Sequence, residues 1–182
     1  MKTQRSNRLP TVAGLFAVSL LAACGTMSSK SMAYSQASLP ASVQVPAGNK
    51  VAWETVGVGE ITYECRAKAD MKSQTEWVFA GPKAVLNDRQ GKQVGTYYGP
   101  PATWEAMDGS QVAVAPAGDG NLPYQLVKAN PAMGAGALTG VTYIQRVALK
   151  GGVAPKMPCT PATVGQKSQV PYQADYIFWK AN

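Results

Sequence analysis

KQVGTYYGPPATWEAMDGSQVAVA, residues 92–115, contains three short runs of strand-forming residues separated by two turn signals. The runs cover residues 92–98, 103–106 and 111–115. The Asp-Gly pair at 108–109 tolerates the positive φ of a tight hairpin turn. The Gly-Pro-Pro triplet at 99–101 interrupts a strand, because proline lacks a backbone N–H. This stretch therefore predicts three consecutive β-strands.

The same pattern continues through the chain, which holds 18 glycines and 13 prolines and shows no useful helical periodicity beyond its N-terminus. Further strands are expected at residues 50–53, 60–67, 76–80, 84–86, 124–128, 139–149 and 174–179. We expect a hairpin connection at 87–91 and a long proline-rich loop at 151–169. About eight to ten such strands predict an all-β fold, either a β-sandwich or a squat β-barrel of short antiparallel strands with long loops.

The N-terminus has the features of a bacterial lipoprotein signal. Three basic residues precede an uncharged apolar run at 11–22, which is too short to span a bilayer. The run ends in Leu-Ala-Ala-Cys at 21–24, and small residues before a cysteine resemble a lipobox, so we expect lipidation of Cys24. The second mature residue, Gly25, favours the outer membrane. The predicted location is therefore the cell envelope, as an outer-membrane lipoprotein that faces the periplasm.

This interpretation divides the chain into three parts. Residues 1–23 are the expected signal peptide, residues 24–41 a flexible tether rich in serine and alanine, and residues 42–182 a single β domain. The N-terminal lipid would attach the protein to the membrane.

Cys65 and Cys159 remain after lipidation of Cys24, and in an oxidising compartment we expect them to form one disulfide. A metal site or a reactive thiol is the alternative. The chain contains no histidine, and two isolated cysteines do not complete a tetrahedral metal site. We therefore predict no metal site and no cofactor.

The net charge of +7 comes partly from the signal, because the mature chain keeps 14 of the 17 basic residues against 10 acidic ones. These charges are scattered and form no basic run, so nucleic acid is not an expected partner. The absence of histidine also excludes a Ser-His-Asp or Cys-His catalytic arrangement.

Five segments occur in an order that resembles a known family. They are GEITYEC (59–65), WVF (77–79), the Gly-Pro to Asp-Gly-Ser stretch (99–110), VTYIQRV with GGVAP (141–155), and VPYQADYIF (170–178). The chain is similar to the bacterial and fungal family called domain of unknown function 3455, over roughly residues 39–179. The resemblance implies a mostly secreted protein of unestablished activity. Relatives commonly carry a histidine before the Gly-Pro, where this chain has Tyr97 and Tyr98.

The first candidate site consists of Tyr97, Tyr98, Trp104, Glu105 and Asp108. Glu105 and Asp108 would supply a carboxylate pair for hydrolysis of an envelope glycan beside an aromatic platform. The alternative interpretation is a buried tryptophan next to a polar hairpin, with Asp108 bonded to the backbone of its own turn.

The second candidate is Arg146, which lies inside an otherwise apolar strand and would need a partner if buried. Asp175, Asp108 and Glu105 are the expected partners in a structural ion pair. The alternative is that Arg146 is the polar anchor for a small ligand inside a barrel.

Three functions follow from these candidates. The favoured one is a non-catalytic binding or structural role in the envelope, with a glycan or a protein as partner. The others are a small glycan hydrolase that uses Glu105 and Asp108, and a small-ligand binder anchored by Arg146.

Overall fold

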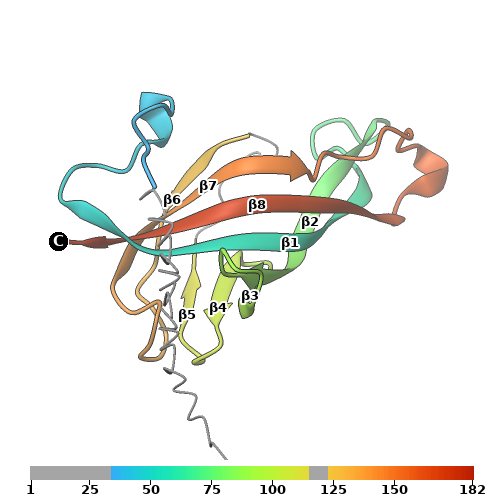
Figure 1. Ribbon diagram of the computed structural model, residues 1–182. Coiled ribbons are helices and arrows are strands. Elements are labelled where there is room, and N and C mark those ends of the chain that lie inside the picture. The colour runs from blue at the N-terminus through green and yellow to red at the C-terminus, as the bar shows by residue number, and fades with distance from the viewer. Residues whose placement is uncertain (1–33, 115–122) are drawn as a thin grey trace, which may run out of the picture. The chain divides into compact units, whose positions relative to one another are not determined.

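The computed structural model of the chain describes residues 34–114 and 123–182. These residues form eight antiparallel strands in one sheet, which curls into a half-barrel (Figure 1). The strands are β1 (Asn49–Ala67), β2 (Thr75–Asn87), β3 (Gln93–Tyr98), β4 (Thr103–Ala106), β5 (Gln111–Ala113), β6 (Gln125–Lys128), β7 (Val141–Gly151) and β8 (Lys167–Ala181). Two short 3-10 turns, η1 (Ala41–Val43) and η2 (Pro161–Thr163), complete the described secondary structure. The predicted all-β class is confirmed.

The strand order is β5-β4-β3-β2-β1-β8-β7-β6, so the first and last long strands lie side by side in the middle of the sheet (Figure 1). The two predicted turns have the expected chemistry. Asp88 Oδ1 accepts hydrogen bonds from the backbone N–H groups of Gln90 and Lys92, and Gly109 has a φ of 82° in the β4–β5 turn.

Three strands are longer than the sequence indicates, with 19 residues in β1, 13 in β2 and 15 in β8. The sequence pattern breaks them at glycines and prolines that the sheet accommodates. Pro82 lies opposite Ile61, and Pro171 lies opposite Glu60. Glycine is required at position 57, because a Cβ there would lie only 2.6 Å from the Tyr176 ring.

The segment that follows β6 connects the two edges of the sheet. On one side, the backbone N–H of Ala129 donates to the carbonyl oxygen of Thr142 in β7. On the other side, Asn130 N donates to Ala113 O, and Gln111 and Met133 exchange two backbone hydrogen bonds at β5. The half-barrel is therefore closed at one end by residues 129–133.

Most of the core lies on the inner face of the curl, where the largest fully buried side chains include Trp104, Tyr176 and Phe178. A smaller cluster lies on the outer face of β7 and β8, around Ile177 and Trp179. Alternation of side chains along β8 explains why successive residues enter different clusters.

Val45 belongs to this outer cluster, and Tyr34 and Leu39 pack against it. The Tyr34 hydroxyl donates to Gln145 Oε1 at 2.8 Å, and Val45 N donates to Gln36 Oε1 at 2.7 Å. The expected signal peptide, the expected lipidation site Cys24 and residues 24–33 of the expected tether lie outside the described residues.

The predicted disulfide between Cys65 and Cys159 is confirmed, and it joins the end of β1 to the loop before β8. Two hydrogen bonds fix the same loop to β2. Thr75 Oγ1 donates to Cys159 O at 2.7 Å, and Trp77 Nε1 donates to Met157 O at 2.8 Å. Across residues 34–114 and 123–182, no helix has the length and apolar character required to cross a membrane.

Candidate functional site

A cavity of about 280 Å³ lies on the inner face of the curled sheet. Its wall is mostly apolar and includes Ile61, Trp104 and the Pro100-Pro101 turn between β3 and β4. Three charged or amide side chains also line it, namely Arg66, Gln125 and Arg146. An apolar chamber with a few polar groups is the usual form of a small-molecule site.

Arg146 is positioned by the alternation of side chains along β7. It stands opposite Gln125 of β6 and Tyr176 of β8, so these three side chains share the inner face of the sheet. The neighbouring Gln145 faces the other way and accepts the hydrogen bond from Tyr34. Arg146 is only 7% exposed, and it therefore places a buried positive charge on the cavity wall.

Tyr97 and Trp104 form the aromatic wall of the cavity. They are directly opposite each other in β3 and β4, and the edge of Trp104 also meets the Tyr176 ring, with centroids 5.5 Å apart. Trp104 is 1% exposed. Its indole Nε1 is buried and has no hydrogen-bond partner among the described residues. The cavity wall thus contains a buried donor that an acceptor on a ligand would satisfy.

The hydroxyl groups of three buried tyrosines lie close to the positive charge of Arg146. Burial raises the pKa of Tyr97 to about 12, while the positive charge of Arg146 and a hydrogen bond from Tyr176 act in the opposite direction. Burial likewise raises the pKa of Tyr172 and Tyr176, whose hydroxyl oxygens lie 3.4 Å apart. These phenols stay protonated at neutral pH and act there as neutral donors and acceptors.

Tyr98 and Glu105 lie on the outer face, because each alternates with an inward-facing neighbour. The Tyr98 hydroxyl donates to Glu105 Oε2 at 3.0 Å. Partial burial, followed by the bond to Glu105, raises the pKa of Tyr98. The structure therefore separates this pair from Tyr97 and Trp104, although all four belong to one sequence stretch.

Asp108 holds the turn between β4 and β5. Its Oδ1 accepts hydrogen bonds from Ser110 N and Ser110 Oγ at 2.9 and 2.6 Å, and its Oδ2 accepts one from Ala137 N at 2.7 Å. The bonds from the Ser110 side chain and the backbone lower the pKa of Asp108. Glu105 and Asp108 thus take part in separate hydrogen-bond arrangements, and Asp108 has the turn role that the sequence offered as its alternative.

Asp175 lies on the outer face, since its neighbour Tyr176 points inward. It forms an ion pair with Arg89 Nη1 at 2.5 Å, and the same guanidinium contacts Glu54 at 2.8 Å. Sequence reasoning did not identify Arg89, nor Arg66 and Gln125 at the cavity. No local pattern indicates these three residues, because their positions depend on strand order and register.

Within the described ranges, no group of three or more histidine, cysteine, aspartate or glutamate residues is placed to hold a metal ion. No curated protein and no solved structure is significantly similar to the chain. A family model does match residues 46–180, which is most of the sequence and contains every strand that borders the cavity. The chain therefore belongs to the family described as protein of unknown function DUF3455.

Proposed function

We propose that the β domain binds a small ligand with an apolar body and an anionic group, and that it does so as a lipid-anchored protein of the cell envelope. The observation that carries the proposal is the buried Arg146 on the wall of a largely apolar cavity. A guanidinium binds a carboxylate or phosphate through two parallel hydrogen bonds, and this contact is stronger away from water.

Trp104 supports the same ligand chemistry. Its buried indole N–H lacks an acceptor among the described residues, and its ring lines the cavity that Arg146 lines. An anionic group beside Arg146 would accept hydrogen bonds from the guanidinium, while the apolar remainder of the ligand would replace water against Ile61 and the Pro100-Pro101 turn. At about 280 Å³, the cavity suits a ligand smaller than most drug-sized molecules.

Two probes with the same carbon chain, one charged and one neutral, separate the contribution of the charge to the affinity from that of the apolar body. Octanoate should bind the full-length protein more tightly than 1-octanol does, by about tenfold or more, because charged hydrogen bonds contribute about 1.5–3 kcal/mol. Titration calorimetry, supported by intrinsic tryptophan fluorescence, measures both affinities. Equal affinities for the acid and the alcohol would contradict an anion-binding role.

Arg146→Met keeps an unbranched apolar stem but removes the guanidinium, so it should abolish the preference for octanoate while leaving octanol binding in place. Arg89→Met is the matched control, because Arg89 lies on the outer face in contact with Glu54 and Asp175. Its octanoate preference should equal that of the wild type. A preference that survives in Arg146→Met would show that another group recognises the anion.

The proposed anchor rests on the Leu-Ala-Ala-Cys pattern at 21–24. In a bacterial host, the full-length chain should incorporate a palmitate label and sediment with membranes. Cys24→Ala should lose both properties, and retention of the label in this variant would contradict lipidation at Cys24.

A further inference from the structure

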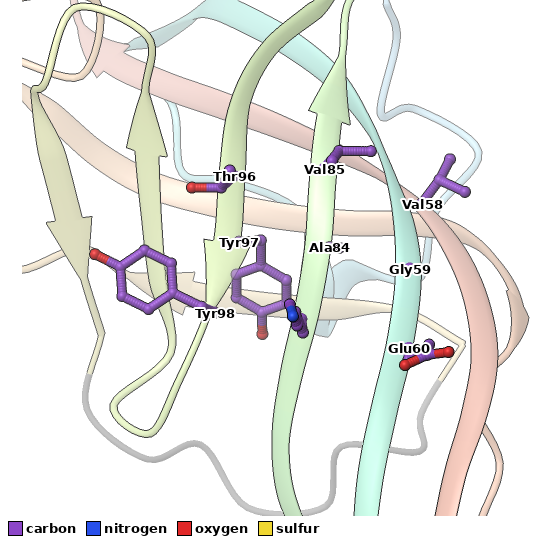
Figure 2. Close-up of a pocket in the computed structure, with 9 residues that line it drawn as sticks. Val58, Gly59, Glu60, Ala84, Val85, Thr96, Tyr97 and Tyr98 are labelled. Atoms are coloured by element: carbon purple, nitrogen blue, oxygen red, sulfur yellow. The ribbon is translucent and has the colours of Figure 1, made fainter.

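A groove of about 530 Å³ lies on the outer face of β1, β2 and β3 (Figure 2). Its side chains alternate along each strand with the inward-facing positions Gly59, Ala84 and Tyr97, so it opens on the opposite face of the sheet from the cavity that Arg146 lines, and Tyr97 borders both. Its volume falls in the range of roughly 300–1,000 Å³ that is typical of ligand sites.

One side of the groove is an apolar row that crosses the strands. Val58 stands opposite Val85, and Val85 stands opposite Thr96. Val58 and Val85 remain 41% and 38% exposed. The floor is the backbone of the strands at Gly59, Ala84 and Tyr97, whose side-chain positions face inward.

The other side is a polar row, about 7 Å further along the strands. Glu60 stands opposite Lys83, and Lys83 stands opposite Tyr98. Tyr98 is 38% exposed, and the hydrogen bond from its hydroxyl to Glu105 restricts the orientation of the ring. Figure 2 shows the Tyr98 ring and the Glu60 carboxylate on opposite sides of Ala84 and Tyr97. The groove therefore combines an aromatic platform, an aliphatic wall and charges of both signs.

These features disfavour three classes of ligand. An added peptide strand would need free backbone groups, but β1, β2 and β3 each pair with a strand on both sides. A polyanion would need a net positive surface, whereas Glu60 offsets Lys83 and Glu105 lies beside Tyr98. A purely apolar partner would remove water from Glu60 and Lys83 without replacing their hydrogen bonds.

We propose that this groove binds a short, uncharged saccharide chain. The C–H face of a sugar ring packs on the exposed face of Tyr98, since an aromatic face is electron-rich and apolar. The sugar hydroxyls donate to the Glu60 carboxylate and accept from the Lys83 ammonium, while less polar ring edges contact Val58 and Val85. This binding site is independent of the anion site inside the half-barrel.

The test uses the full-length chain with two uncharged probes, the β-1,4-linked tetramer of N-acetylglucosamine and maltotetraose. Changes in backbone amide NMR shifts locate binding, and their concentration dependence gives the affinity. At least one probe should shift amides of β1, β2 and β3 around the groove at millimolar concentrations. Shifts that map elsewhere, or no shifts with either probe, overturn the proposal.

Tyr98→Ala should weaken binding by about five- to tenfold, the size expected for loss of one aromatic contact. Tyr124→Ala is the matched control, because Tyr124 has a similar exposure of 36% and does not line the groove. Arg146→Met should also bind the saccharide as the wild type does. Unchanged affinity in Tyr98→Ala, or tighter binding of a sulfated tetrasaccharide than of either uncharged probe, contradicts the proposal.

Discussion

Tyr97 and Trp104 stack across the β3–β4 pair, with ring centroids 4.4 Å apart and ring planes inclined by 15°. The stack joins two short strands to the main core, because Trp104 also contacts Tyr176 and Phe178. Offset aromatic pairs contribute beyond the area that they bury. The short β3–β4 hairpin therefore depends on these two side chains for its attachment to the long strands.

Trp104→Ala should reduce the free energy of unfolding by about 3–5 kcal/mol, because it leaves a cavity at a side chain that is 1% exposed. Urea unfolding followed by circular dichroism measures the loss. Met107→Ala, at a position 70% exposed just after β4, should change the stability by less than about 0.5 kcal/mol. Equal effects of the two substitutions would mean that the stack is not part of the cooperative core.

Gly81 lies where β2 meets the turn that borders the cavity. Its φ is 149°, and an added Cβ would overlap the carbonyl oxygen of Gly99. Gly81→Ala should therefore destabilise the fold by about 1–3 kcal/mol and should weaken octanoate binding by displacing the Pro100 turn. Gly91→Ala is the control. Alanine would be strained at the φ of 86° found at this position, but its Cβ would meet nothing within 4 Å. Gly91→Ala should leave octanoate binding unchanged.

The Cys65–Cys159 bridge spans 94 residues of sequence. Replacement of both cysteines by alanine should cost about 4.7 kcal/mol in the chain-entropy treatment, because it frees a long loop in the unfolded chain. Thermal unfolding of this double variant and of the oxidised wild type measures the difference. Reduction should destabilise the wild type and should leave the stability of the double variant unchanged. Free thiols in the oxidised native protein would contradict the bridge.

Buried tyrosines predict unfolding at alkaline pH. An unfolded tyrosine ionises near pH 10, whereas burial raises the pKa of Tyr97 to about 12 and also raises that of Tyr176. The folded state therefore holds these protons more tightly, and the resulting stability is fully present below about pH 10 and is lost as the pH rises toward about 12. Urea unfolding at a series of pH values should show this decline.

Tyr97→Phe should have a shallower decline, because one raised phenol is absent. Ultraviolet absorbance of tyrosinate gives an independent check, since ionisation of the buried rings should coincide with loss of the circular dichroism signal. Ionisation of all eight tyrosines near pH 10 in a protein that stays folded would refute the assignment.

Local chemistry explains which parts of the fold are predictable from the sequence. The three runs within 92–115 form β3, β4 and β5, and the Asp-Gly turn forms as expected because its conformation depends on adjacent residues only. β1, β2 and β8 are longer than the pattern indicates. Whether Gly59 or Pro171 ends a strand depends on the neighbouring strand, which the sequence alone does not identify.

The same distinction applies to the candidate sites. Glu105 and Asp108 are close in sequence, yet one side chain contacts Tyr98 and the other holds a turn. Arg146 and Tyr97 are distant in sequence, yet both line one cavity. Four successive strand pairings, β3–β2, β2–β1, β1–β8 and β8–β7, join their strands in one curled sheet. Convergence of this kind follows from strand order, which residue patterns do not encode locally.

The hydrogen bonds between residues 130–133 and β5 also affect how copies of the chain meet each other. An exposed edge strand is a template on which another molecule can add its own strand, and this is a common route to aggregation. Here the outer edge of β5 is already occupied at Gln111 and Ala113 by the chain itself. The chain thus covers with its own backbone an edge that would otherwise accept a strand from another copy.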